Sequence, residues 1–309
     1  MARVAICICT YRRPEGLRRL LKSLEDLVTI ESVRVIVADN DPGQRQGMKV
    51  CAALKEEGYR WPIDAFVVSN RGLPHARNAV LEAGFSAPDI EFVAMLDDDE
   101  YVESQWLQAM LDVQLRTDAD VVGGAVIPEF EKSPSAWMLR SRIYKRDDTT
   151  DGLVDELYGD GNILLARKIL RLVPMPFFDP VFSFVGGHDT YFFQQIKGKG
   201  IKFARASKAR VFETYPASRM TLRWALMRAY RSGTVHIEIK KRLNKSPMKW
   251  PKEAAKIAAV LLFSPVEFCL FILSPSRRVD ALCRLFRAFG KIGGFLGYRY
   301  EEYRNVHGH

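Results

Sequence analysis

The sequence contains few cysteines and has no CxxC pair or other metal-binding cysteine spacing. Its five cysteines are Cys7, Cys9, Cys51, Cys269 and Cys283, and reduced, packed thiols of a cytosolic protein explain them best. Cys7 and Cys9 lie two apart in an apolar run, which places them on one face of a strand. The N-terminus also lacks the long apolar segment and small-residue cleavage site of a signal peptide. We therefore expect a cytoplasmic protein without a disulfide framework.

Both common glycine-rich phosphate-binding loops are absent as well. A dinucleotide-binding site would need a GxGxxG turn after the first apolar run, whereas residues 9–16 read CTYRRPEG, and no P-loop is present. This excludes a dinucleotide site of the usual kind and counts against a nucleotidyltransferase. Any phosphate must be held by a metal, by arginine side chains or by helix N-termini.

The charge of the 309-residue chain is divided unevenly. Residues 201–309 carry 22 Lys and Arg against 7 Asp and Glu, whereas residues 1–200 carry 24 against 30. A basic C-terminal part attracts polyanions such as nucleic acid or an anionic membrane. The acidic first part argues against nucleic acid, so we expect no nucleic-acid partner.

The first 127 residues alternate between continuous apolar runs and amphipathic segments. The expected strands are 4–9, 33–38, 64–69, 91–96 and 120–127, and the expected helices are 14–27, 43–58, 73–84 and 103–116. This βα alternation predicts an α/β fold with a Rossmann-like, mostly parallel sheet flanked by helices. Strands that are apolar throughout fit burial on both faces of the sheet.

Polar clusters follow the first four strands, at the sheet edge where ligands of such folds bind. After the fourth strand, Asp97, Asp98, Asp99 and Glu100 stand in a row. Carboxylates one residue apart can hold Mg²⁺ or Mn²⁺ together with a substrate phosphate, or they can form a solvated turn that opens the next helix.

Other clusters at this edge also allow two interpretations. Arg71 and Arg77 suit phosphate or carboxylate binding, or they are helix-surface charges. Asp39 could accept hydrogen bonds from a base or ribose, or it completes a tight turn. Asp189 follows two glycines and His188, and it is either a helix N-cap or a general base for an acceptor hydroxyl.

From Pro216 onward the chain is basic and helical. Residues 254–273 are nearly long enough to span a bilayer but contain Lys256, Pro265 and Glu267. Because charges that deep are costly, an interfacial helix is favoured over packing on the core, and a true span is the third alternative.

Six motifs in order resemble the inverting glycosyltransferases of family 2, which have the GT-A fold. They are ICTYRRP (8–14), ADND (38–41), NRGLPHARN (70–78), LDDDE (96–100), GDGNILLARK (159–168) and GGHD (186–189). Residues 211–233 are similar to the tail of members that build bacterial exopolysaccharides, so the resemblance covers roughly residues 3 to 233. It implies transfer of a single sugar, glucose from UDP-glucose, to a lipid-diphosphate-linked oligosaccharide with a β product.

The resemblance also implies roles for individual residues. Thr10, Tyr11, Arg13, Asp39, Arg71, Arg77, Asp97 and Asp98 are expected to bind the nucleotide sugar, Asp99 the metal, and Asp189 is expected to be the catalytic base. Within the D-x-D pair, Asp97 lies toward the ribose and Asp98 fills the variable middle place. The family usually has Glu before the base, and His188 stands there instead. The Q-x-x-R-W signature of processive synthases is absent, because TLRW at 221–224 matches it only superficially.

The expected organisation has two parts. Residues 1–215 form the GT-A domain, with a nucleotide-sugar half at 1–127 and an acceptor half at 128–215. Residues 216–309 form a basic helical extension that associates with the cytoplasmic face of the bacterial inner membrane. An inactive scaffold of a polysaccharide assembly complex is the alternative function, and it would predict a broken metal or base site.

Overall fold

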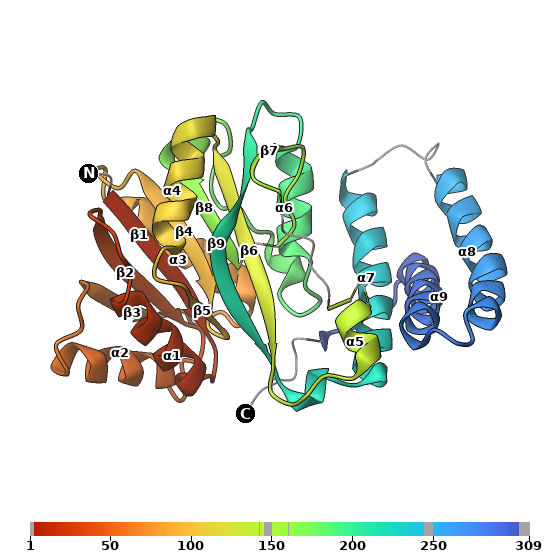
Figure 1. The fold of residues 1–309 in the computed structure, drawn as a ribbon. Helices are drawn as coiled ribbons and strands as arrows, with labels where there is room; N and C mark the ends of the chain where they lie inside the picture. Colours follow the sequence, from red (N-terminus) through yellow and green to blue (C-terminus); the bar gives the residue numbers. More distant parts are fainter. Residues whose placement is uncertain (1–2, 142, 145–149, 160, 244–249, 303–309) are drawn as a thin grey trace.

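The computed structural model describes residues 3–141, 143–144, 150–159, 161–243 and 250–302 (Figure 1). Its strands are β1 (Arg3–Thr10), β2 (Ser32–Asp39), β3 (Ile63–Val67), β4 (Phe92–Asp97), β5 (Glu100–Val102), β6 (Val121–Phe130), β7 (Gly152–Val154), β8 (Asn162–Ala166) and β9 (Phe203–Tyr215). Its helices are α1 (Pro14–Glu25), α2 (Gln46–Glu56), α3 (Leu73–Ser86), α4 (Trp106–Thr117), α5 (Ala136–Arg140), α6 (His188–Ile196), α7 (Leu222–Leu243), α8 (Trp250–Leu270) and α9 (Pro275–Phe295). Short 3₁₀ turns are η1 (Arg167–Arg171), η2 (Pro180–Phe182) and η3 (Ala217–Arg219). The α/β alternation expected for the first 127 residues is confirmed.

The strands form one nine-stranded sheet in the order β3-β2-β1-β4-β8-β6-β9-β5, with β7 paired to β9. The first four strands of this order are parallel, as predicted. The second half is mixed, because β8 enters antiparallel between β4 and β6, and β5 pairs antiparallel with β9. The expected strand at 120–127 is therefore separated from β4 by a strand that comes later in the chain.

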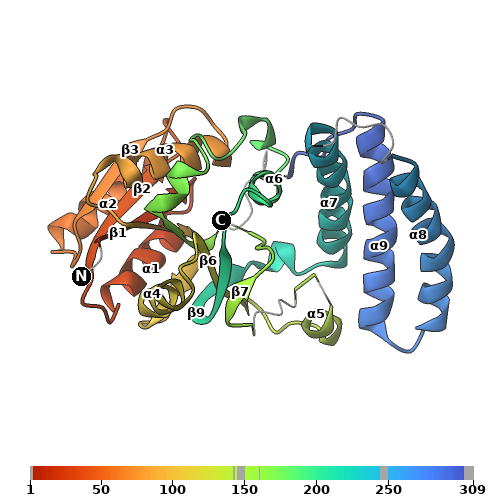
Figure 2. The same cartoon turned by 90° about the horizontal axis from the view of Figure 1, so that it is seen from above.

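Helices lie on both faces of this sheet (Figure 2), and an apolar core fills each side. Side chains of β1 alternate between them, since Val4, Ile6 and Ile8 belong to one core and Cys7 and Cys9 to the other. The first core is completed by α1, α2 and α4, and the second by α3 and α6. The prediction that the strands are buried on both sides is confirmed for β1, β2 and β4, but it is wrong for the edge strand β3, in which only Ile63 is buried.

All five cysteines are free thiols, in line with the expected absence of disulfides. Four of them are buried, but Cys269 on α8 is exposed, so packing does not explain that residue.

The three C-terminal helices stack side by side, with α7 against α9 and α9 against α8 (Figure 2). Gly233 of α7 and Gly290 of α9 allow this close approach, because a Cβ at either position would collide with the backbone of the other helix. Across the described ranges, none of the helices combines the length and apolar character that crossing a bilayer requires. The spanning alternative for residues 254–273 is therefore not supported, and α8 instead lies on α9 with an exposed outer side.

A buried carboxylate ties these three helices together. Glu253 of α8 is 2% exposed and forms ion pairs with Lys240 of α7 and Lys291 of α9, and His236 Nε2 lies 3.2 Å from its Oε1. Although burial acts in the opposite direction, the two lysine hydrogen bonds lower the pKa of Glu253 to about 2. Burial and the charge of Lys291 lower the pKa of His236 to about 4, so the imidazole is neutral at pH 7.

Replacing this carboxylate should destabilise the C-terminal helices. We expect Glu253→Gln to lower the free energy of unfolding by about 3–5 kcal/mol, because two ammonium groups lose their buried counter-charge. Urea unfolding followed by circular dichroism measures the loss. The matched control is Glu267→Gln on the same helix, whose partner Arg284 is 40% exposed, and which should cost less than about 1 kcal/mol. Equal effects of the two substitutions would contradict this interpretation.

Candidate active site

A cavity of about 760 Å³ opens at the carboxyl ends of β1 and β4 and extends across to α6 and α7. The predicted site residues that line it are Thr10, Tyr11, Arg13, Arg71, Arg77, Asp97, Asp98, Asp99 and Asp189. His188 and Glu100 line it as well, whereas Asp39 does not. Residues from both ends of the chain therefore meet in one place.

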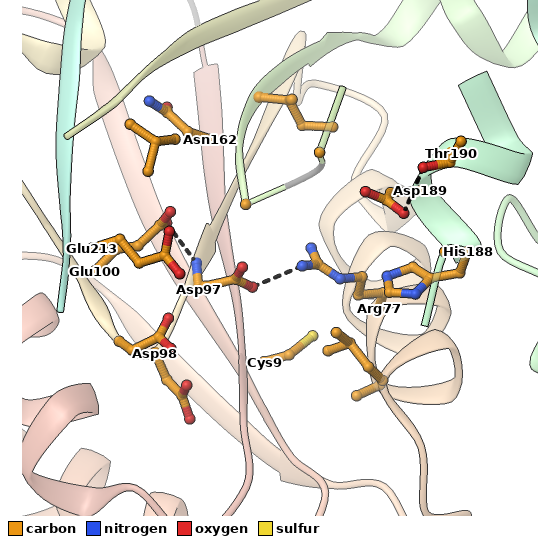
Figure 3. Close-up of a pocket in the computed structure, with 18 of the residues that line it drawn as sticks. Cys9, Arg77, Asp97, Asp98, Glu100, Asn162, His188, Asp189, Thr190 and Glu213 are labelled. Carbon is orange, nitrogen blue, oxygen red and sulfur yellow. Dashed lines mark hydrogen bonds and ion pairs between the residues drawn. The ribbon is translucent and has the colours of Figure 1, made fainter. Parts of the chain in front are cut away.

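The first carboxylate of the acidic turn is held by a buried arginine. The guanidinium of Arg77, from the second turn of α3, donates from Nη2 to Asp97 Oδ1 at 2.7 Å (Figure 3). Arg77 is 1% exposed, while the side chain of Asp97 is 35% exposed and reaches the cavity. Gly161 allows β8 to pass closely, because a Cβ there would lie 2.6 Å from Asp97 Oδ2. The ion pair with Arg77 thus fixes the orientation of the Asp97 side chain.

The second carboxylate turns back into the protein. Asp98 Oδ2 accepts hydrogen bonds from Thr10 Oγ1 at 2.9 Å and from the Tyr11 amide at 3.3 Å, and Asp98 Oδ1 accepts from Arg13 Nη1 at 3.0 Å. Burial raises the pKa of Asp98, and the charge of Arg13 counteracts this rise. Asp98 therefore fixes the loop after β1. It is more than the spacer expected for the middle position of the motif.

The third carboxylate is held from two sides. Arg13 Nη1 also donates to Asp99 Oδ2 at 2.9 Å, and Arg219 Nη1 lies 3.5 Å from the same oxygen. Arg219 lies in η3 after β9 and also approaches Glu213 at 3.7 Å. Sequence reasoning missed Arg219 as a site residue, because nothing near position 219 indicates that the chain returns to the acidic turn.

Glu100 completes a concentration of negative charge. It lies in β5 and is 3% exposed, with Oε2 accepting a hydrogen bond from the Asp97 amide at 2.9 Å. Burial and the charges of Asp97, Asp99 and Glu213 raise its pKa well above the ordinary value. Glu100 does not begin a helix, since α4 starts at Trp106.

These carboxylates suit a hard divalent cation. Among the described residues, no group of three or more His, Cys, Asp or Glu has the geometry of a metal site. The oxygens of Asp97 and Asp99 are nevertheless the ligand type that Mg²⁺ and Mn²⁺ prefer, and such ions usually take the rest of their ligands from water and substrate phosphate. The repulsion at Glu100 shows that added positive charge would be favourable here.

In the loop after β1, the aromatic ring of Tyr11 lies close to two arginines. Arg12 and Arg71 lie 5.2 and 5.0 Å from the centre of the Tyr11 ring. Asp39 is 1% exposed, and its two oxygens accept hydrogen bonds from the Asp41 and Met48 amides. The structure thus shows the turn role of Asp39.

Asp189 lies across the cavity from the acidic turn (Figure 3). It is the second residue of α6, and the position before that helix is Gly187, with φ of 87°, so the N-cap alternative for Asp189 is wrong. Its Oδ1 accepts a hydrogen bond from Thr190 Oγ1 at 3.4 Å. His188 is buried with its ring edge-on to Phe178 at 5.3 Å, so it packs against Phe178 in the wall of the cavity.

Helix α7 contributes a wall of the cavity that was not predicted. Arg228, Arg231, Ser232 and Val235 line it, together with Glu302 beyond α9. The net charge of residues 201–309 did not indicate this cavity wall, because a net charge does not distinguish arginines that face a cavity from arginines on the surface.

Comparison with known proteins identifies the family. The model of glycosyl transferase family 2 matches residues 5–172. The succinoglycan biosynthesis protein ExoM of Rhizobium meliloti is 31% identical over 309 residues, an alignment that covers 97% of this chain and 94% of that protein. The chain belongs to glycosyltransferase family 2. The glycosyltransferase activity expected from its six motifs is confirmed at this level.

Solved structures show that the family 2 enzyme has the GT-A fold. The mannosyltransferase PcManGT from Pyrobaculum calidifontis, in complex with GDP-Man and Mn²⁺, superposes with a TM-score of 0.65 at 16% identity, covering 95% of this chain and 87% of that one. TarS residues 1–349 of S. aureus, in complex with UDP, superpose with a TM-score of 0.51 at 14% identity, covering 97% and 93%.

Loss of the Asp98 carboxylate should release the loop after β1 of the glycosyltransferase. In Asp98→Ala the Tyr11 amide and Thr10 lose their acceptor, so we expect amide hydrogen exchange of residues 10–13 to speed up about tenfold or more. Hydrogen exchange with mass spectrometry measures this. Asp112→Ala removes an exposed carboxylate that accepts a hydrogen bond from Gln108 on the surface of α4, and it should leave the loop unchanged. Unaltered exchange in Asp98→Ala would show that other contacts hold the loop.

Proposed function

We propose that this glycosyltransferase moves a single sugar, glucose from UDP-glucose, to a lipid-diphosphate-linked oligosaccharide during bacterial exopolysaccharide biosynthesis, with inversion to a β product. One observation carries the proposal: a single cavity holds the acidic turn after β4 on one side and Asp189 on the other. The likeness to a succinoglycan biosynthesis protein supports the pathway, and a solved neighbour bound to UDP supports the donor.

The donor end of the cavity is built for a nucleoside diphosphate. Thr10, Tyr11 and Arg13 surround the nucleotide in our proposal, and Asp97 lies toward the ribose. Asp99 would hold Mg²⁺ or Mn²⁺, and a neighbouring enzyme crystallised with Mn²⁺ supports this. A bound cation neutralises the diphosphate and so stabilises it as a leaving group. Arg77 holds Asp97 in its orientation through the ion pair at 2.7 Å.

Asp189 supplies the base at the acceptor end. Its carboxylate takes the proton of the acceptor hydroxyl while that oxygen forms a bond to the anomeric carbon. The bond from this carbon to the diphosphate oxygen breaks, and UDP leaves with the electron pair. Because Asp189 and the acidic turn lie on opposite sides of the cavity, attack comes from the face opposite the leaving group. An α-linked donor then gives a β-linked product through an oxocarbenium-like transition state.

A donor screen tests this function. The purified protein is incubated with Mg²⁺ or Mn²⁺ and a panel of nucleotide sugars, and release of the nucleoside diphosphate is measured with and without a lipid-linked acceptor. We expect UDP-glucose to be used, EDTA to abolish the reaction, and Asp189→Asn to slow it by about 10²–10⁴-fold. UDP affinity should be unchanged in Asp189→Asn. Absence of turnover with every donor would favour an inactive scaffold instead.

The domain organisation that we propose follows the sequence with one change. Residues 1–215 form the GT-A domain, with 1–127 for the donor and 128–215 for the acceptor. Within residues 216–309, the part up to the end of α7 belongs functionally to the catalytic domain, since α7 lines its cavity. The rest, α8 and α9, would form the membrane-facing part.

The outer side of α8 and its turn into α9 is suited to a bilayer surface. Its exposed apolar side chains are Leu262, Phe263, Val266, Leu270, Ile272 and Leu273. Exposed Lys252, Lys256 and Arg277 flank them. Apolar side chains beside cations fit an anionic membrane, which agrees with peripheral attachment to the cytoplasmic face of the inner membrane.

Removal of two of these apolar side chains should weaken membrane binding. We expect Phe263→Ser combined with Leu273→Ser to reduce co-sedimentation with phosphatidylglycerol-containing vesicles at least about tenfold, because each buried side chain contributes about 1.5–3 kcal/mol. Leu115→Ser, at an 82% exposed position on α4, is the control and should bind like the unmodified protein. Equal binding by all three proteins would exclude this surface as the attachment site.

A further inference from the structure

One face of α7 presents cations to the cavity. Arg228, Arg231, Ser232 and Val235 follow the i, i+3, i+4, i+7 spacing of a single helical stripe, and all four line the cavity. Arg228 also lies 5.1 Å from the centre of the Trp224 ring, which restricts its side chain. We call these four residues the α7 stripe. The Cα atoms of its two arginines are three residues apart, about 4.5 Å along the helix axis.

The α7 stripe lies beside the proposed base. Val235 packs directly against Gly187, where any side chain would collide with it. Gly187 is the N-cap position directly before α6, and Asp189 is the second residue of that helix. The ligands expected for the donor lie elsewhere, at the ends of β1 and β4. The α7 stripe is therefore on the acceptor side of the cavity.

An internal carboxylate already occupies this stripe. Glu302, 71 positions further along the chain, places Oε2 2.8 Å from Arg231 Nε. The side chains of Glu302 and Arg231 are only 9% and 12% exposed, and both line the cavity. Two guanidinium groups facing a cavity need anionic partners, because an unpaired cation with little access to water is costly. Glu302 supplies one negative charge to that wall.

We propose that the α7 stripe is the subsite for the diphosphate of the acceptor, and that the carboxylate of Glu302 occupies this subsite until the acceptor displaces it. This rests on the proposed function, which requires an acceptor linked to a lipid diphosphate. A diphosphate carries more negative charge than one carboxylate and presents several oxygens to Arg228 and Arg231 at once. The acceptor then binds through its diphosphate, and its hydroxyl is directed to the neighbouring Asp189.

Direct binding to the UDP-loaded protein tests the subsite. Protein saturated with UDP and Mg²⁺ is titrated calorimetrically with inorganic pyrophosphate and, separately, with geranyl diphosphate. We expect both to bind, Arg231→Gln to weaken binding about tenfold or more, and Glu302→Gln to tighten it severalfold because the internal competitor is gone. The control is Arg223→Gln, which removes an exposed arginine of the same helix that does not line the cavity, and it should change nothing.

Several outcomes would overturn the subsite. If pyrophosphate binds only by displacing UDP, the stripe belongs to the donor, and if Glu302→Gln weakens binding, Glu302 is part of the ligand site. Thermal unfolding of each variant shows whether it folds, and Arg228→Gln replaces Arg231→Gln if the latter does not. Since no turnover is needed, failure here alongside a successful donor screen rejects the subsite alone. Binding without turnover by any donor would reject the proposed function.

Discussion

Three arginines from distant parts of the chain neutralise the acidic turn after β4, and the layout of the cavity depends on these contacts. Arg77 comes from α3, Arg13 from the loop after β1, and Arg219 from η3 near the start of the C-terminal helices. Four acids at residues 97–100 would otherwise repel one another at a strand end. Because each arginine belongs to a different segment, charge neutralisation also fixes where α3, the β1 loop and η3 lie around the site.

The acidic residues of this turn differ in role: one stabilises the fold, and others are available for the reaction. Asp98 faces inward and holds the β1 loop, whereas Asp97 and Asp99 reach the cavity. Glu100 is buried beneath them with a raised pKa, which is an unfavourable environment that the rest of the fold must offset. Such local strain is typical of functional sites, and the arginines relieve it only in part.

Local patterns were sufficient to predict the helices and strands of the first 127 residues, with the exception of the short strand β5. Apolar runs defined β1 to β4, and the polar residues that followed them are at the edge where the cavity opens. The antiparallel insertion of β8 could not be predicted, because no local pattern records which strand pairs with β4. Arg219, Arg231 and Glu302 were missed for a similar reason: their roles depend on contacts between segments far apart in sequence. Asp39 has the same signal in both of its interpretations: its hydrogen bonds with the Asp41 and Met48 amides are those of the turn, and its binding of a base or ribose stays a prediction.

Helix α7 lies between the candidate active-site cavity and the part of the chain proposed to face the membrane. One side of it lines the cavity with the α7 stripe, while Gly233 lies against α9 so closely that the two backbones nearly touch. Glu253 then ties α8 to both helices through Lys240 and Lys291. This stack sets the position of the cavity relative to the outer side of α8. The proposed acceptor has its sugar in the cavity and its lipid in the bilayer. With such an acceptor, the basic C-terminal region would be part of the acceptor site as well as a means of attachment.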